Sequence, residues 1–292
     1  MTDPGNAALA ARRSISKKYR DGIWKPFIGA LKDYHLIEPG DKIAVCVSGG
    51  KDSFLCAVLM KMLQGISETP FELEFLTMDP GYAPQNRNKL EENAALLDIP
   101  LTVFETNVFD VAYKTEHSPC YLCARMRRGH LYSEARRLGC NKIALGHHKN
   151  DVIETAVMSM FYASQLQCMP PKLRSTNFPG MQLIRPLYKV AENNVKAWAR
   201  YNGLEFLRCA CRFTEAAAED EKNSKRLETK NIIAELKKTN PNIENSIFNA
   251  VHSVCLDTFP SYKTRGRLFT FNDIFESRAE DLSTDVRLES DR

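Results

Sequence analysis

The sequence predicts an α/β protein in which a parallel sheet carries helices on both faces, with a helix before it and a helical segment after it. Two observations lead to this class. Short apolar runs at 43–47, 73–78, 101–104 and 142–145 alternate with stretches of helical spacing, as in β-α-β units. The 292 residues also suffice for one large domain or two small ones. Because ligands bind outside the carboxyl ends of such strands, the residues after each strand are the candidate site.

The clearest local signal follows the first predicted strand and precedes a predicted helix at 54–63. Adjacent glycines let the backbone approach a ligand closely, and a helix N-terminus directs unpaired N–H groups at it. The loop differs from the kinase-type nucleotide loop, which has four residues between its glycines; a chance Gly-Gly turn is the alternative. We therefore predict a phosphate-binding loop, here called the phosphate loop. Its residues are Ser48, Gly49, Gly50, Lys51, Asp52 and Ser53.

Composition and charge narrow the class of protein. An apolar fraction of 43% and a charged fraction of 26% are ordinary for a soluble globular chain, and a net charge of +4 permits a polyanionic partner without requiring one. No apolar run approaches the roughly 20 residues of a membrane span, and the start lacks a signal-peptide pattern. We expect a cytoplasmic protein with no membrane partner. The nine cysteines are then buried thiols, metal ligands or redox groups rather than disulfides.

Five segments are expected along the chain. Residues 1–14 are small and polar and are expected to be mobile. Residues 15–38 form a helical segment whose basic side is either solvated or in contact with RNA. Residues 39–212 contain the sheet and the candidate site. Residues 213–260 form a second helical segment, and residues 261–292 form an acidic tail that we expect to be flexible.

Two cysteine pairs lie about ninety residues apart. Cys120 and Cys123 form a Cys-x-x-Cys pair, which alone leaves a zinc half-site, a redox pair and chance all open. Cys209 and Cys211 form a Cys-x-Cys pair. Together the pairs offer three or four thiolate ligands to a metal centre.

A predicted helix to about residue 137 follows the first cysteine pair and carries Arg125, Arg127 and Arg128. A solvated helix face is the alternative to an RNA-binding patch beside the thiols.

Further polar residues stand at the carboxyl ends of predicted strands. Asp79 ends the second strand, and Gly146, His147 and His148 follow the fourth. Asp151 is positioned to cap the next helix. A zinc site on the two histidines is disfavoured because no third ligand stands at the usual spacing.

Six segments, in this order, resemble the tRNA 2-thiocytidine synthetase (TtcA-like) family, which are PP-loop tRNA thiolation enzymes among the N-type ATP pyrophosphatases. The similarity runs from about residue 15 to about residue 260 and implies an adenine nucleotide alpha hydrolase-like fold. The segments are Ser-Gly-Gly-Lys-Asp-Ser at 48–53, Pro-Cys-Tyr-Leu-Cys at 119–123, Arg-Arg-Gly at 127–129, Ala-Leu-Gly-His-His at 144–148, Met-Pro-Pro-Lys-Leu at 169–173 and Arg-Pro-Leu at 185–187.

The resemblance implies an enzyme that uses ATP to adenylate the C2 oxygen of an anticodon-loop cytidine and replaces that oxygen with sulfur. It implies a [4Fe-4S] cluster on Cys120, Cys123 and a third cysteine. Cys211 is the first choice and Cys209 the second, because this chain has Cys-x-Cys where the family more often has Pro-Cys-x-x-Cys. The implied partners are tRNA, a sulfur donor (a cysteine desulfurase or free sulfide) and a second copy of the chain. The alternatives are a persulfide thiolase without a cluster and an ATP-dependent amidating or ligating enzyme.

The resemblance also implies roles for single residues. The phosphate loop would hold the phosphates of ATP, with Lys51 neutralising charge, and Asp52 would either orient the loop or bind Mg²⁺. Arg125, Arg127 and Arg128 would hold RNA phosphates. The nucleotide end of the site would be completed by Asp79, Gly146, His148 and Asp151.

Overall fold

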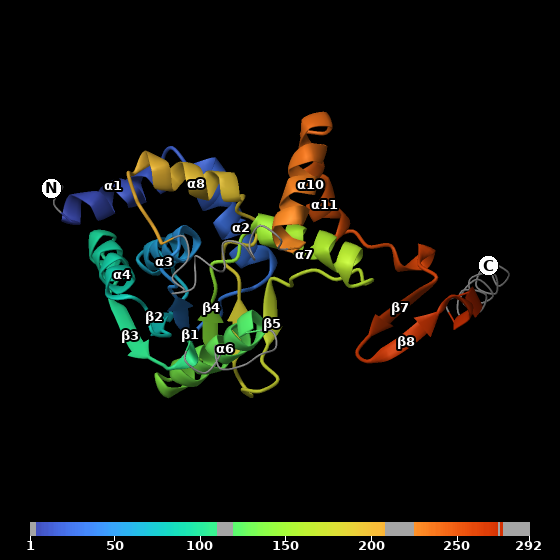
Figure 1. Ribbon diagram of the computed structural model, residues 1–292, viewed down its shortest axis with the longest axis horizontal. Coiled ribbons are helices and arrows are strands. Elements are labelled where there is room, and N and C mark those ends of the chain that lie inside the picture. The colour runs from blue at the N-terminus through green and yellow to red at the C-terminus, as the bar shows by residue number, and fades with distance from the viewer. Residues whose placement is uncertain (1–3, 110–118, 208–224, 274, 277–292) are drawn as a thin grey trace, which may run out of the picture. The chain divides into compact units, whose positions relative to one another are not determined.

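The fold is seen in a computed structural model, which describes residues 4–109, 119–207, 225–273 and 275–276. The chain divides into two units, residues 1–244 and 245–292. Within the described part of the first unit, six strands form one sheet in the order β3-β2-β1-β4-β6-β5 (Figure 1). The neighbours from β3 to β6 pair in parallel, and β5 pairs antiparallel with β6. The strands are β1 Lys42–Cys46, β2 Glu72–Asp79, β3 Leu101–Glu105, β4 Lys142–Ala144, β5 Lys172–Arg174 and β6 Gln182–Ile184.

Helices cover both faces of this sheet, as the sequence predicts. Alternate residues of β1 enter different cores: Ile43 and Val45 pack beneath α3, α8 and the N-terminal helices, whereas Ala44 and Cys46 pack with Tyr132 of α6. The helices of the first unit are α1 Pro4–Ser16, α2 Lys25–Asp33, α3 Lys51–Gln64, α4 Pro84–Leu96, α6 Pro119–Arg137, α7 Lys149–Tyr162, α8 Glu192–Tyr201 and α10 Lys225–Thr239, and α11 Ile243–Ala250 begins at its end. None of the described helices is long and apolar enough to cross a membrane.

The N-terminal segment differs from its prediction. Residues 4–14, expected to be mobile, belong to α1, where Ala11 and Ile15 are fully buried. The indole Nε1 of Trp198 donates a hydrogen bond to the carbonyl oxygen of Ala11 at 3.3 Å. Alanines at helical spacing form the buried face of α1, so composition alone gives a weak signal. The helical segment expected at 15–38 is also interrupted, because a π-helical turn, Arg20–Trp24, precedes α2.

One strand of the sheet was not predicted. Lys172–Arg174 is the antiparallel edge strand β5, a strand that is absent from the expected elements. All three of its residues are exposed, so the strand has no alternation of apolar and polar residues that a sequence pattern detects.

The second unit also departs from the expectation. Residues 261–270 were expected to belong to a flexible tail, but they form a hairpin of β7 Ser261–Thr264 and β8 Arg267–Thr270. Its turn residues Arg265 and Gly266 have φ angles of +48° and +80°, as a two-residue hairpin turn requires. A short helical turn, Leu256–Thr258, precedes the hairpin. The tail from residue 277 onward lies outside the described residues.

Candidate active site

The phosphate loop joins β1 to α3, as predicted, and hydrogen bonds between its own residues stabilise its conformation. Gly49 has a φ angle of +90°, a conformation that side chains disfavour. The hydroxyl of Ser53 accepts a hydrogen bond from the backbone N–H of Ser48 at 3.1 Å and donates one to the carbonyl oxygen of Gly50 at 2.9 Å. Ser53 is buried, so its hydroxyl holds the turn that presents the N-terminus of α3 to a ligand.

A second glycine lets the β4–α7 connection lie directly against this loop. A Cβ atom at Gly146 would lie 2.8 Å from the backbone carbonyl carbon and oxygen of Asp52. Real Cβ atoms do not approach backbone atoms this closely. Only glycine therefore fits at position 146 without a shift of the backbone. The sequence placed Gly146 in the site by its position after a strand, and the structure shows that it contacts the phosphate loop.

We expect Gly146→Ala to lower the free energy of unfolding by about 1–3 kcal/mol, because the added methyl group overpacks the contact with Asp52. ATP binding should weaken as well, since the start of α3 must shift. Gly129→Ala is the matched control: a Cβ at that position in α6 meets nothing within 4 Å, and the change should add about 0.5–1 kcal/mol. Urea unfolding and a fluorescent-ATP titration measure both effects. Equal stabilities of the two variants would contradict the contact.

Three charged side chains meet at the start of α3. The Nζ atom of Lys51 lies 2.9 Å from Oδ2 of Asp52 and 3.2 Å from Oε1 of Glu192. Burial opposes ionisation of Glu192, but a hydrogen bond from Lys196 and the charge of Lys51 lower the pKa of Glu192 to about 2. The other carboxylate oxygen of Asp52, Oδ1, is buried and has no hydrogen-bond partner. Asp52 thus keeps one oxygen available for a cation or a substrate group. The role of Glu192 as a partner of Lys51 was not predicted from the sequence.

His148 and Asp151 form a reciprocal cap at the start of α7. His148 is the N-cap, and its Nδ1 accepts from the backbone N–H of Asp151 at 3.3 Å, while the Asp151 carboxylate accepts from the backbone N–H of His148 at 2.8 Å. Arg226 of α10 binds Asp151 and also Glu154, the latter at 2.8 Å. Asp151 therefore caps the helix as predicted, but from the third helical position rather than as the N-cap residue, and both of its oxygens have partners within the chain.

Asp79 stands at the carboxyl end of β2, as predicted, and its carboxylate organises the turn that follows. It accepts backbone hydrogen bonds from Gly81 at 2.8 Å and Tyr82 at 2.7 Å, and it pairs with Arg87 of α4 at 2.8 Å. Burial raises the pKa of Asp79, but these partners together lower it. Its contact with a nucleotide stays a prediction.

A cavity of about 390 Å³ opens at the carboxyl ends of β1, β2 and β4. The phosphate loop forms one wall through Ser48, Gly50, Asp52 and Ser53, and Arg127 and Arg128 of α6 line it as well. We call this the nucleotide cavity. Gly146 and Asp151, two of the predicted site residues, also line it, together with His147, Cys46, Val47, Leu76, Met78, Leu131, Ile143 and Leu145.

His147 adds a neutral base to the nucleotide cavity. Burial lowers the pKa of His147 to about 4, and its Nδ1 atom is buried without a hydrogen-bond partner. The ring is therefore uncharged at neutral pH and has a nitrogen that can pair with a bound group.

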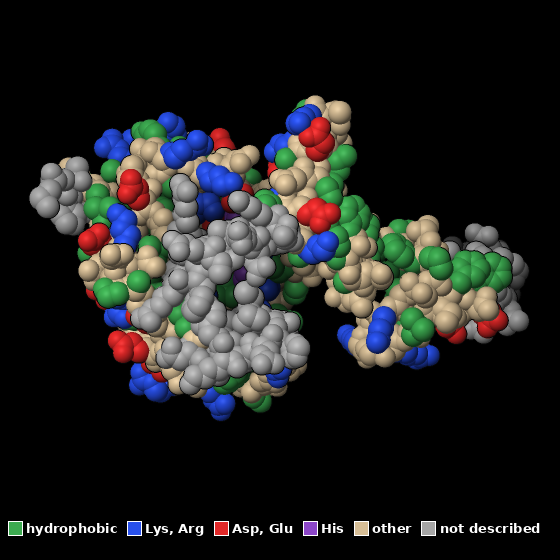
Figure 2. Space-filling view, viewed as in Figure 1, with side chains coloured by type: hydrophobic (Ala, Val, Ile, Leu, Met, Phe, Trp, Pro, Cys, Tyr) green, Lys and Arg blue, Asp and Glu red, His purple; other side chains and the backbone are tan. Residues whose placement is uncertain are grey.

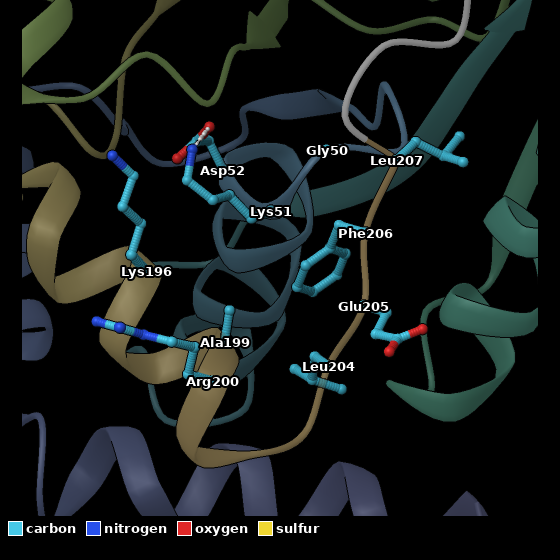
Figure 3. Close-up of a pocket in the computed structure, with 10 residues that line it drawn as sticks. All are labelled: Gly50, Lys51, Asp52, Lys196, Ala199, Arg200, Leu204, Glu205, Phe206 and Leu207. Atoms are coloured by element: carbon cyan, nitrogen blue, oxygen red, sulfur yellow. Dashed lines mark hydrogen bonds and ion pairs between the residues drawn. The ribbon is translucent and has the colours of Figure 1, made fainter.

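The other side of the phosphate loop faces a second cavity, of about 810 Å³ (Figure 3). Gly50, Lys51 and Asp52 line it opposite the segment that follows α8. At the end of this segment the backbone N–H of Leu207 donates to the carbonyl oxygen of Gly49 at 3.2 Å. Leu207 stands two residues before Cys209 in the sequence, so the chain that leads to the second cysteine pair is attached to the loop.

The predicted cluster ligands are only partly described. Cys120 and Cys123 belong to the first turns of α6, and their side chains lie outside the described residues. Cys209 and Cys211 lie outside them altogether. Arg125, the third predicted RNA contact, does not line the nucleotide cavity but a neighbouring groove that Arg128 shares.

A family model described as the PP-loop domain matches residues 25–233. The chain belongs to the PP-loop family. Among PP-loop relatives, the tRNA-cytidine(32) 2-sulfurtransferase of Methylobacillus flagellatus is 32% identical over 267 residues, which cover 90% of this chain and 84% of the relative. The protein of the same name from Cellvibrio japonicus is 34% identical over 228 residues, 77% of this chain and 73% of the relative. These relatives confirm the resemblance to the tRNA 2-thiocytidine synthetases.

The architecture of this PP-loop protein is confirmed by a solved structure. The U34-tRNA thiolase NcsA from Methanococcus maripaludis, described with its [4Fe-4S] cluster, has a TM-score of 0.61 and 20% sequence identity over 78% of this chain and 76% of its own. At that identity the similarity concerns the fold: a sheet with helices on both faces and the phosphate loop at its carboxyl edge.

Proposed function

We propose that this PP-loop protein adenylates the C2 carbonyl oxygen of cytidine 32 in the tRNA anticodon loop and replaces that oxygen with sulfur. One observation carries the proposal. The nucleotide cavity has the phosphate loop on one wall and Arg127 and Arg128 of α6 on another, and α6 is the helix that begins with Cys120 and Cys123. Groups suited to ATP and to RNA therefore line one cavity, and the helix that carries the two arginines also carries the two cysteines in its first turns.

The first half-reaction needs groups that hold a triphosphate and stabilise its leaving group. The C2 oxygen attacks the α-phosphorus of ATP, the bond to the β-phosphate oxygen breaks, and pyrophosphate leaves with the electron pair. Backbone N–H groups at the start of α3 and the ammonium of Lys51 stabilise the charge that develops on it. Asp52 fits Mg²⁺, because its buried Oδ1 makes no hydrogen bond and carboxylate oxygens suit this cation. The ring nitrogen Nε2 of His148 lies 3.7 Å from this Oδ1.

The second half-reaction needs RNA held close to a sulfur source. Arg127 and Arg128 line the cavity and would hold RNA phosphates there, which predicts salt-sensitive binding. Sulfide adds to C2 and AMP departs with the former carbonyl oxygen. The thiol that forms at C2 must lose its proton as AMP departs, and His147, a neutral base that lines the cavity, would accept that proton.

A cluster fits the chemistry of the donor set. Cysteine thiolates are the ligands that iron–sulfur clusters prefer, and Cys120 and Cys123 stand three residues apart in one helix. Among the residues that the structure describes, no group of three histidine, cysteine or acidic side chains is placed to hold a metal. Cys120, Cys123 and Cys211, or Cys209 in its place, would hold a [4Fe-4S] cluster. When bound, such a cluster would offer a coordination position, free of cysteine, for hydrosulfide that the sulfur donor provides.

Three measurements on protein purified without oxygen test the proposal. We expect pyrophosphate release that depends on tRNA, about four irons per chain, and 2-thiocytidine in the product when sulfide or a cysteine desulfurase is supplied. A tRNA with uridine at position 32 is the control substrate and should support none of the thiolation. Pyrophosphate release without tRNA would contradict the RNA substrate. Thiolation by iron-free protein would instead support the persulfide route.

A further inference from the structure

A groove of about 650 Å³ lies beside the nucleotide cavity, between α6 and the β5–β6 connection. Arg128 lines both hollows, so the groove is the neighbour of the cavity in which ATP is proposed to bind. Arg125 lines the groove from α6, and Arg174 and Asn177 line it from β5 and the connection that follows. Its other lining residues are Leu122, Met126, Gly129, Tyr132, Leu173, Ser175, Thr176 and Phe178.

The β5–β6 wall of this groove is held in one shape by contacts on both sides. The hydroxyl of Ser175 accepts from the backbone N–H of Phe178 at 3.1 Å, and the backbone N–H of Ser175 donates to the carbonyl oxygen of Met181 at 2.9 Å. The ring of Phe178 stacks on Tyr132 of α6, with centroids 5.2 Å apart and an interplanar angle of 11°. Asn177 therefore stands in a preformed turn that is anchored to α6.

The charge of the groove favours an anion. Arg125, Arg128 and Arg174 are all exposed, and no carboxylate among the described residues forms an ion pair with them. On the same helix, Arg137 does pair with Glu134, at 2.6 Å. None of the described residues that line the groove is acidic. Within the described residues, these guanidinium groups therefore remain available to an anionic ligand.

We propose that this groove binds the nucleotide next to the modified cytidine, and this inference rests on the proposed function. Arg125 and Arg174 bind the phosphates on either side of that nucleotide, and the side-chain amide of Asn177 pairs with an edge of its base. Proteins that recognise RNA loops commonly splay out unstacked bases and read their edges by hydrogen bonds, with arginines on the backbone. Arg128, shared with the nucleotide cavity, spans the two subsites.

Binding of a fluorescent anticodon stem-loop RNA across a salt series tests this groove. Arg174→Ala should weaken binding about tenfold and reduce the slope of log K against log salt by about 0.7. Asn177→Ala should weaken binding less, and it should remove the preference between stem-loops that differ only in the base beside the target. Fluorescent-ATP affinity should be unchanged in both variants. Arg136→Ala is the matched control, an exposed arginine of α6 that lines neither hollow.

The outcomes separate this inference from the proposed function. If the unmodified protein neither binds nor thiolates the RNA, the proposed function is wrong, and the groove assignment that rests on it is wrong as well. If it does both, and Arg174→Ala and Arg136→Ala have the same affinity and salt slope, the groove is not an RNA subsite. Asn177→Asp keeps the shape of the side chain and adds a negative charge. It should weaken RNA binding more than Asn177→Ala does, and equal binding by the two variants would also overturn the assignment.

Discussion

Asp52→Asn is expected to lower kcat/KM for tRNA-dependent pyrophosphate release by about 100- to 1,000-fold. The amide keeps the shape of the carboxylate but removes its charge. Oδ2 of Asp52 lies 2.9 Å from Nζ of Lys51, and Oδ1 is buried without a hydrogen bond, 3.7 Å from Nε2 of His148. The substitution therefore removes the proposed Mg²⁺ ligand. It also removes one of the two carboxylates that pair with Lys51, so that Glu192 remains as the other. Pyrophosphate release at saturating and limiting Mg²⁺ measures the loss.

Asp98→Asn is the control for this substitution. Asp98 also pairs with a lysine, Lys61, at 3.0 Å, but it lies on the surface at the end of α4. Its replacement should leave pyrophosphate release unchanged. Thermal unfolding of both variants checks that the fold is intact. Full activity of Asp52→Asn at limiting Mg²⁺ would show that Asp52 neither binds the cation nor positions Lys51.

Cys120→Ala is expected to abolish thiolation while leaving ATP affinity within about twofold of the unmodified protein. Alanine is a favourable helix residue, so α6 should keep its course and continue to present Arg127 and Arg128 to the nucleotide cavity. Fluorescent-ATP titration, iron content and 2-thiocytidine in digested tRNA are the three readouts. Iron should fall with thiolation if both depend on this thiolate.

Cys255→Ala is the matched control, because Cys255 is an exposed free cysteine of the second unit. Its replacement should change none of the three readouts. If Cys120→Ala lost ATP binding as well, with its fold intact, the separation of ATP and sulfur roles would be wrong. If it kept full thiolation, Cys120 would have no part in sulfur delivery.

Elements of the parallel sheet were predictable because their signals are local. Buried parallel strands form short apolar runs, so the expected 43–47 and 73–78 agree closely with β1 and β2. The missed elements have no such pattern: α1 buries alanines, β5 is exposed throughout, and the β7–β8 hairpin depends on two turn residues. Their stability comes from neighbours distant in the chain or from single backbone angles.

The site residues, too, were predictable only where their signal in the sequence is local. The phosphate loop and Gly146 were identifiable because each follows a strand, where topology alone places a ligand. Glu192 was not, because its role depends on the approach of α8 to Lys51 across 141 residues of sequence. The local position of Glu192, in the first turn of a helix, is ordinary for an acidic residue. The roles of the cysteines stay predictions.

The hydrogen bond between Leu207 and Gly49 has a thermodynamic consequence. The phosphate loop and the chain that leads to the second cysteine pair share a backbone contact of 3.2 Å, and Leu207 also packs where a side chain at Gly49 would stand. A ligand that moves the loop therefore changes the free energy of the attached segment. By reciprocity, anything bound through that segment changes the affinity of the loop for phosphate by the same factor. Occupancy at one end of the site is thus linked to occupancy at the other.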